Sequence, residues 1–371
     1  MVFTVYFSDY LKAFNSMEME RWNYHWGCVL TGAKYLYEVT GKEEYREAIL
    51  NFGRKYVDEH GTIRGFCAEE QNVDLMASGR LLYFLYDETG EERYLKGIHG
   101  IMENLRNQPR TSFGNFWHKK IYPYQVWLDG LYMVQPFYME YERRFNQKKN
   151  YEDSVNQFRN VRKYLFDEKK QLYYHAYDET RQMIWANKET GLSPCFWLRS
   201  IGWYLLALCD CYEISQDGDA QAVLGGLLKE AIQGVFLYQD KDSGLFYQLV
   251  DRDDLKNNYL ETSGSAMVAY AVMKGCRLGI LDRKAYYEKG ARILAALEAE
   301  KMKVSGGEFH LTGTCASAGL GPKDERDGSA EYYLSEAVKD DNAHGVSMCM
   351  MAYSEWLKME ELLNDEKRTA V

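Results

Sequence analysis

The stretches YEVTGKEEY at residues 37–45 and YDETGEERY at residues 86–94 decide the fold, because they are two copies of one motif about 50 residues apart. Each copy closes an amphipathic segment, turns at a Thr-Gly pair and opens the next segment with acidic residues. A glycine just past a helix end, followed by acidic residues in the next first turn, is typical of two helices joined by a tight turn. The motif therefore predicts a chain built from helical hairpins.

Looser copies of the motif extend this pattern along the chain and begin at Tyr141, Tyr212 and Gly275. Long apolar segments, expected to be buried inner helices, precede the turns at residues 23–39, 72–87, 127–145, 197–214, 261–280 and 344–362. Segments with charges at helical spacing, expected to be half-exposed outer helices, follow the turns at residues 43–57, 91–105, 151–165 and 284–298.

Six inner helices need six outer partners, and the sixth inner segment has no partner after it. Residues 8–20, left over at the start, would supply that partner and close the ring. We therefore predict an all-α fold, an (α/α)6 barrel of six helical hairpins with short β-hairpin insertions, as a single domain over residues 1–371. An open α-solenoid is the alternative. Residues 171–186 alternate about a turn and are expected to form one β-hairpin.

Composition narrows the classes of partner. The 371 residues carry a net charge of −10, which disfavours binding to nucleic acid. No uninterrupted run of eighteen apolar residues occurs, and the first residues lack the apolar core of a signal peptide, so we expect no membrane partner. Eight cysteines without a CxxC pair predict reduced thiols of a cytoplasmic protein, and no metal site or cofactor is signalled. A monomer and a homodimer both remain open.

Unusual polar and aromatic residues recur near the start of each inner segment. Because consecutive inner helices run parallel, their N-terminal ends gather at one rim of the barrel. The residues at these starts are Trp22 and Tyr24, Asn72 and Asp74, Trp127 and Asp129, Arg199 and Trp203, Glu261, Thr262 and Ser263, and His344. Helix capping explains a single Asn, Asp or Ser at such a place without any ligand. The interleaved Trp and Arg favour a shared pocket.

Asp129 is the strongest single candidate for a catalytic residue, because it lies in YPYQVWLDGLYMVQPFYMEY with almost no charged neighbours. A carboxyl group among aromatic side chains is poorly solvated when charged, so a protonated form suited to general acid catalysis becomes available. Asp74 falls at the matching place one repeat earlier, so the two carboxyl groups are expected at the same rim. Two facing carboxylates raise each other's proton affinity, and glycosidases often use such a pair.

Basic residues are predicted near the same rim. His118, Lys119 and Lys120 precede the third inner segment, and Arg199 opens the fourth. In so acidic a protein, this local basic set favours a small acidic substrate, and Arg suits a carboxylate. Lys120 is equally well explained as a solvated surface residue. His175, in the predicted hairpin, is either structural or part of the site.

The segments FWHKKIYPYQVWLDGLYM (116–133), FWLRSIGWYLLAL (196–208) and ETSGSAMVAYAV (261–272), with GTCASAG and His344 later, resemble the unsaturated rhamnogalacturonyl hydrolases, glycoside hydrolase family 105. The resemblance implies the (α/α)6 barrel and a site for Δ4,5-unsaturated uronic acids. It also implies Asp129 as general acid/base and Asp74 as second carboxylate. The substrate-binding residues that it implies are His118, Lys119, Trp127, His175, Arg199 and Trp203, with a looser match at Trp22 and Tyr24.

The reaction that the resemblance implies is hydration of the C4=C5 bond of an unsaturated uronide such as the galacturonyl-rhamnose left by pectin-degrading lyases. A glucuronyl unit and a sulfated algal fragment stay open as the preferred substrate, and disaccharides made by lyases from rhamnogalacturonan, ulvan and glycosaminoglycan would distinguish them. Asp129 would protonate C4, water would add at C5, and the resulting hemiketal would open and release the neighbouring sugar. The alternatives are an unsaturated glucuronyl hydrolase, an inverting glycosidase or a sugar 2-epimerase on the same fold. A helical-repeat scaffold without catalytic activity is the alternative from another class.

Overall fold

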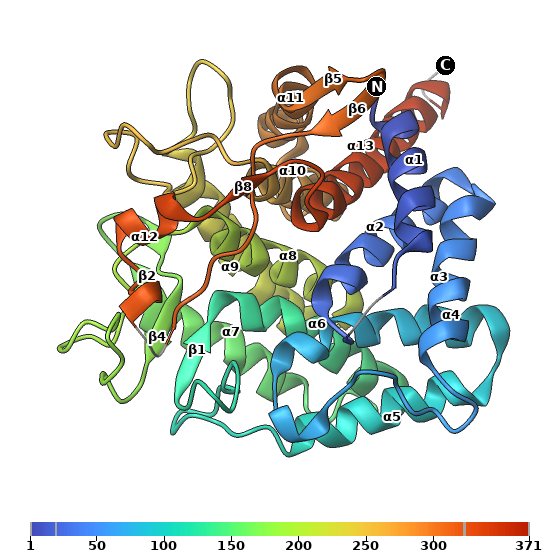
Figure 1. Cartoon of the computed structure of the whole chain (residues 1–371), viewed down its shortest axis with the longest axis horizontal. Helices are drawn as coiled ribbons and strands as arrows, with labels where there is room; N and C mark the ends of the chain where they lie inside the picture. Colours follow the sequence, from blue (N-terminus) through green and yellow to red (C-terminus); the bar gives the residue numbers. More distant parts are fainter. Residues whose placement is uncertain (1, 19–20, 322–323, 370–371) are drawn as a thin grey trace.

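The computed structural model describes residues 2–18, 21–321 and 324–369, and two layers of helices dominate it (Figure 1). The inner helices are α2 (Tyr24–Thr40), α4 (Arg80–Thr89), α6 (Leu128–Phe145), α8 (Leu198–Ser215), α10 (Thr262–Arg277) and α13 (Ala343–Thr369). The outer helices are α1 (Phe3–Ser16), α3 (Glu43–Tyr56), α5 (Glu92–Arg106), α7 (Tyr151–Leu165), α9 (Gly218–Phe236) and α11 (Arg283–Lys301). A short helix, α12 (Ala330–Ser335), lies outside the two layers.

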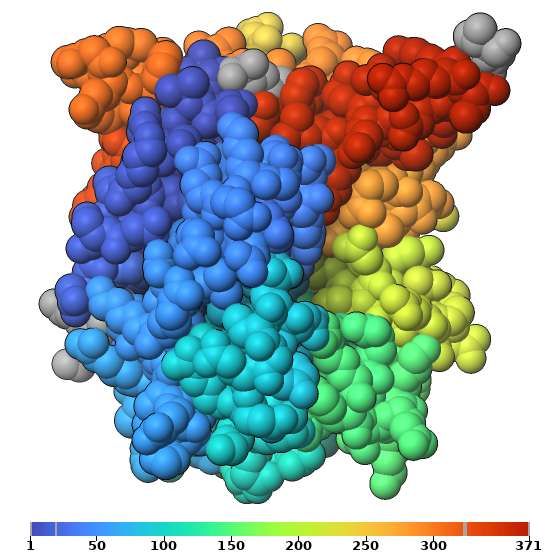
Figure 2. All heavy atoms as spheres, turned by 90° about the vertical axis from the view of Figure 1, so that its right-hand side faces the viewer, coloured from blue at the N-terminus to red at the C-terminus, as the bar shows by residue number. Residues whose placement is uncertain are grey.

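The inner helices close into a ring. Neighbours in chain order pack against each other, with α4 meeting α6 through the contact of Tyr83 with Phe137. Helix α13 packs against both α10 and α2, which joins the two ends of the series. In Figure 2 the colours follow one another around the face from blue through green and orange to red, and the red segment meets the blue one. Helix α1 packs against α3 and α13 and is thus the sixth outer helix. The predicted (α/α)6 barrel is confirmed, and the open solenoid is wrong.

The two motif copies turn as their sequence predicts. Gly41 and Gly90 follow the last residues of α2 and α4 with φ angles of 65° and 68°. Their backbone N–H groups donate to the carbonyls of Tyr37 and Tyr86, each at 2.8 Å. Glycine adopts this left-handed conformation without a Cβ clash, which is why the motif holds a glycine there.

The second inner segment departs from the prediction of one helix over 72–87. It begins with two 3-10 turns, η2 (Val73–Leu75) and η3 (Ala77–Gly79), before α4 starts. The Asn72 side chain accepts from the Asp74 N–H at 3.0 Å, and the Ser78 hydroxyl donates to the Asn23 carbonyl at 2.6 Å. Such local side-chain bonds compete with the α-helical ladder, and an apolar pattern does not report them.

Within residues 2–18, 21–321 and 324–369, four two-stranded sheets accompany the helices. They pair β1 (Gln125–Trp127) with β4 (Ala176–Asp178), β2 (Phe166–Asp167) with β3 (Leu172–Tyr173), β5 (Met302–Ser305) with β6 (Glu308–Leu311), and β7 (Thr314–Cys315) with β8 (Val338–Lys339). The expected hairpin within 171–186 is wrong, because β3 pairs with β2 and β4 pairs with the distant β1. Alternation marks strands but does not identify their partners.

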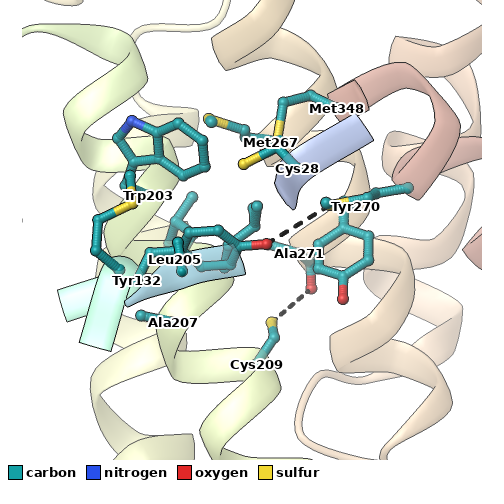
Figure 3. Close-up of a cluster of buried hydrophobic side chains, with 14 of the residues drawn as sticks. Cys28, Tyr132, Trp203, Leu205, Ala207, Cys209, Met267, Tyr270, Ala271 and Met348 are labelled. Atoms are coloured by element: carbon teal, nitrogen blue, oxygen red, sulfur yellow. Dashed lines mark hydrogen bonds between the residues drawn. The ribbon is translucent and has the colours of Figure 1, made fainter. Parts of the chain in front are cut away.

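Large apolar side chains fill the middle of the ring. Trp203 stacks on Tyr132 at 4.9 Å between ring centroids, and the sulfur-containing side chains of Cys28, Met267 and Met348 pack nearby (Figure 3). This core separates two cavities, one at each end of the inner helices. The cavity at their C-terminal ends, of about 550 Å³, is lined by ion pairs that include Arg80, Asp210 and Lys274. Among the described residues, no helix is both long and apolar enough to cross a membrane.

Candidate active site

The cavity at the N-terminal ends has a volume of about 480 Å³, within the range of about 300–1,000 Å³ that is usual for small-molecule sites. The starts of the first three inner segments, the loop before β1 and residues 317–319 line it. Seven of the ten predicted site residues are among the lining residues: Trp22, Tyr24, Asp74, His118, Lys119, Trp127 and Asp129. The predicted rim is therefore a hollow, although only half of the inner helices contribute to it.

Asp129 lies in the first turn of α6 with 9% of its surface exposed. Its Oδ2 atom is buried without a hydrogen bond in the described structure, and the Nε2 atom of His175 lies 3.1 Å from it. The pairing of β1 with β4 creates this contact, since Trp127 stands opposite Ala176 and the Leu128 N–H donates to the His175 carbonyl at 3.0 Å. A carboxyl group with an imidazole behind it thus faces the cavity.

Asp74 holds a close ion pair. Its Oδ2 lies 2.6 Å from the ammonium of Lys119, and its Oδ1 lies 3.5 Å from Nε2 of His118. The backbone fixes this arrangement, because the Val73 N–H donates to the His118 carbonyl at 3.1 Å. Burial opposes the charge of Asp74, but Lys119 together with the imidazoles of His118 and His25 outweighs burial and lowers the carboxyl pKa. The expectation that a carboxylate pair would raise the proton affinity of Asp74 is therefore wrong, since a cation was not foreseen at that distance.

An aromatic stack forms one wall. His118 lies flat on Trp127 at 4.4 Å, and Tyr122 lies parallel to the same indole at 5.3 Å. Burial lowers the His118 pKa to about 4, so this imidazole is neutral at pH 7. His118 therefore adds a polar neutral group rather than the positive charge expected from the sequence. Lys120 is exposed and does not line the cavity.

Four predicted substrate-binding residues are almost closed off from solvent. Trp22 and His175 are 0% exposed, and Arg199 and Trp203 are 1% exposed. The Trp22 indole donates to the Leu75 carbonyl at 2.8 Å, and Trp203 is covered by Tyr132. In this conformation His175, Arg199 and Trp203 do not line the cavity, whereas Trp22 lines it with its side chain covered. A direct contact of these four side chains with a ligand stays a prediction.

Arg199 belongs to a buried polar network below the cavity. Its guanidinium donates to the Ser263 hydroxyl at 3.1 Å and to the Cys315 carbonyl at 2.6 Å. The Glu261 carboxylate accepts from the backbone N–H groups of Ser263 and Gly264, which makes it the N-cap of α10. For Glu261 the capping interpretation is thus correct.

Three lining or adjacent residues were not singled out from the sequence. His25 lines the cavity beside Tyr24, whose hydroxyl lies 3.0 Å from Nε2 of His344, and burial lowers the His25 pKa to about 4. Arg326, in η4 (Asp324–Arg326), lines the mouth, and no ion pair with it is found among the described residues. Tyr333 on α12 contacts His175. His25 could have been found from the sequence, because it follows the predicted site residue Tyr24. The sequence around Arg326 and Tyr333 has no feature that marks a site.

Comparison with known proteins identifies the family of the chain that forms this cavity. The sequence model of Glycosyl Hydrolase Family 88 matches residues 6–360. The chain belongs to that family. This glycoside hydrolase is also 38% identical to a solved glycoside hydrolase from family 105 of C. acetobutylicum ATCC 824, with a TM-score of 0.90 over 96% of this chain and 99% of the other. Family 105, the resemblance seen in the sequence, is thereby confirmed, and an enzyme rather than a binding scaffold is established.

Two relatives illustrate the range of similarity. Over 231 residues this glycoside hydrolase is 40% identical to Protein Atu3128 of Agrobacterium fabrum, covering 61% of this chain and 98% of the relative. Over 290 residues it is 28% identical to unsaturated rhamnogalacturonyl hydrolase YesR of Bacillus subtilis, covering 75% and 77%. Among the described residues, no group of three or more His, Cys, Asp or Glu side chains is placed to hold a metal ion.

Proposed function

We propose that this glycoside hydrolase removes a Δ4,5-unsaturated uronic acid, with galacturonic acid as the preferred unit, from the non-reducing end of a lyase-generated oligosaccharide such as unsaturated galacturonyl-rhamnose. The observation that carries the proposal is the Asp129 carboxyl group, which lines the cavity with His175 Nε2 at 3.1 Å behind it. The similarity to YesR supports the rhamnogalacturonyl substrate class. We also propose that the protein is cytoplasmic, forms a single domain and is a monomer or a homodimer.

The substrate is an enol ether, in which the ring oxygen is attached to C5 of a C4=C5 double bond. Protonated Asp129 gives its proton to C4, which leaves a cation shared by C5 and the ring oxygen. Water then adds at C5, and Asp129 takes back the proton that the water loses. The hemiketal opens at C5, C1 collapses to an aldehyde, and the neighbouring sugar leaves as an alcohol. One water is consumed, and Asp129 ends protonated as it began.

The other lining residues bind the substrate and set the charge of the cavity. Ionised Asp74, held by Lys119, adds negative charge to the cavity, which favours the cationic intermediate. The His118–Trp127–Tyr122 stack offers a flat wall against the sugar ring. Lys119 and the exposed Arg326 supply positive charge for the acid group of the substrate.

The deciding experiment compares unsaturated disaccharides whose first unit is galacturonyl or glucuronyl, together with saturated galacturonyl-rhamnose as the control. We expect the ultraviolet absorbance of the conjugated double bond to disappear fastest with unsaturated galacturonyl-rhamnose, and no release of sugar from the saturated control. Faster turnover of the glucuronyl compound would favour an unsaturated glucuronyl hydrolase. Hydrolysis of the saturated control at a similar rate would overturn the hydration mechanism.

A further inference from the structure

A line of three buried groups ends at the proposed acid. The Tyr333 hydroxyl lies 2.6 Å from Nδ1 of His175, and Nε2 of the same imidazole lies 3.1 Å from Oδ2 of Asp129. Tyr333 and His175 are both 0% exposed. Tyr333 comes from α12 and contacts His175, so a segment outside the two helical layers reaches the Asp129 carboxyl group through one imidazole.

The direction of the first hydrogen bond follows from the chemistry of the phenol. Burial raises the Tyr333 pKa well above 10, so the hydroxyl keeps its proton. A buried O–H without an acceptor is costly, and Nδ1 of His175 is the acceptor that the described structure offers this hydroxyl. Tyr333 therefore donates to Nδ1, and a nitrogen that accepts in this way carries no hydrogen. The hydrogen of the neutral ring must then be on Nε2.

The Nε2–H group of His175 lies next to the Asp129 carboxyl group. Nε2 of His175 and Oδ2 of Asp129 are both buried, lie 3.1 Å apart and have no hydrogen-bond partner among the described residues. An N–H group at 3.1 Å places a partial positive charge beside Oδ2, which favours an unprotonated oxygen at that position. Oδ2 is closed to solvent, whereas the Asp129 side chain as a whole is 13% exposed, so the carboxyl group meets the cavity through Oδ1.

We propose that Tyr333 is a positioning residue that holds His175 as its Nε2–H tautomer and thereby keeps the catalytic proton of Asp129 on Oδ1, facing the substrate. This inference rests on the proposed function in its last step only. When Oδ1 gives its proton to C4, the charge left on the carboxylate is stabilised by the partial positive charge of the Nε2–H group 3.1 Å from Oδ2. Oδ1 regains a proton from the attacking water, and His175 neither gains nor loses one.

The charged and titratable groups that face Asp129 from neighbouring elements stay the same when only the Tyr333 hydroxyl is removed. These groups are Tyr24 on α2, His118 and Lys119 before β1, and Arg199 on α8. A change in the pH profile of a Tyr333→Phe enzyme is therefore attributable to the loss of the hydroxyl, because the phenyl ring still fills its place.

The first measurement needs no substrate. Nitrogen-15 NMR of the full-length enzyme, labelled in its histidine rings, reports which nitrogen carries the hydrogen, and a His175→Gln sample identifies the His175 signals. We expect Nε2–H in the natural enzyme and a mixture of tautomers in Tyr333→Phe. A hydrogen on Nδ1 of His175 in the natural enzyme would overturn the proposal, whatever the enzyme hydrolyses.

The second measurement is the pH dependence of hydrolysis. In Tyr333→Phe we expect kcat to fall about tenfold with KM nearly unchanged. A tenfold fall corresponds to the loss of about 1.4 kcal/mol of stabilisation that acts in the transition state and not in the bound ground state. We also expect the pH profile of hydrolysis to shift, because the Nε2–H group is no longer held beside the Asp129 carboxyl group. Tyr83→Phe is the matched control, since it removes a buried hydroxyl that donates to the Phe137 carbonyl near the opposite cavity.

The outcomes separate the two proposals. An Nε2–H tautomer that is lost in Tyr333→Phe, in an enzyme inactive on every unsaturated disaccharide, would support the tautomer assignment and contradict the proposed function. Hydrolysis with an unshifted pH profile in Tyr333→Phe would contradict the positioning role of Tyr333 and leave the proposed function intact. Equal losses in Tyr333→Phe and Tyr83→Phe would reduce Tyr333 to a packing residue.

Discussion

The ammonium of Lys119 lies 2.6 Å from Oδ2 of Asp74, and this ion pair keeps a buried carboxylate charged at the edge of the cavity. The pair forms because residues 72 and 119 meet in an isolated antiparallel bridge. It decides the charge state of Asp74, since burial alone would favour the neutral acid. The first prediction tests that balance.

Replacing Lys119 by Met should move the acid limb of activity to higher pH. In the natural enzyme the Asp74 pKa is lowered, so its negative charge persists below its ordinary pKa of about 3.9. Without Lys119 burial is unopposed, and Asp74 takes up a proton at higher pH. The measurement is kcat/KM on unsaturated disaccharide across pH, with Lys119→Arg as the variant that keeps the charge. An unmoved acid limb in Lys119→Met would contradict this role of Asp74.

Asp129→Asn should retain the fold and lose turnover by a factor of about 10²–10⁴, because an amide fills the same volume but cannot donate and regain a proton at this site. Disappearance of the double bond measures turnover, and circular dichroism checks the fold. Asp153→Asn, at the half-buried pair with Arg110, is a control of the same chemistry away from the cavity. Near-normal turnover by Asp129→Asn would remove the general acid from the proposal.

Arg326→Gln should raise KM for acidic disaccharides by about three- to tenfold, as expected for an exposed charge-assisted contact. The effect should shrink as salt is added, because the side chain is exposed and its charge is screened. Steady-state kinetics at low and high ionic strength provide the measurement. Arg159→Gln, on outer helix α7 with an ion pair to Glu152, is the matched control. A KM equal to that of this control would show that Arg326 does not meet the substrate.

Asp210→Asn should lower the free energy of unfolding by about 3–5 kcal/mol, because it leaves buried cations without their counter-charge. Asp210 is 1% exposed and accepts from Arg80 at 2.6 Å and from Lys274 at 2.8 Å. Burial opposes its charge, but Lys274 and Arg80 outweigh burial and lower its pKa.

The sign of the pH dependence follows from that lowered pKa. Asp210 contributes stability above its ordinary pKa of about 3.9 and loses it as the pH falls toward the lower folded value. The difference between the natural enzyme and Asp210→Asn should therefore narrow in acid, as urea unfolding at several pH values would reveal. Asp9→Asn, at an exposed pair, is expected to change stability little. A similarly small effect of Asp210→Asn would contradict the buried network.

The sequence by itself determined the barrel and much of the rim. The repeated Thr-Gly turns at 40–41 and 89–90 and the alternation of apolar and charged segments are local signals, because a helix cap and a buried face each depend on residues a few positions apart. Parallel inner helices then place Asp74 and Asp129 at one end without any further information.

Only the tertiary structure decided which groups touch. The ion pair of Asp74 with Lys119, the contact of His175 with Asp129 and the burial of Arg199 all join residues from segments far apart in the chain. Their distances depend on how strand β4 crosses to β1 and on how closely the inner helices pack. Charge and proton affinity change steeply over a few ångströms, so residue types at a helix end could indicate a site, but only the packed neighbours could set the protonation of each member.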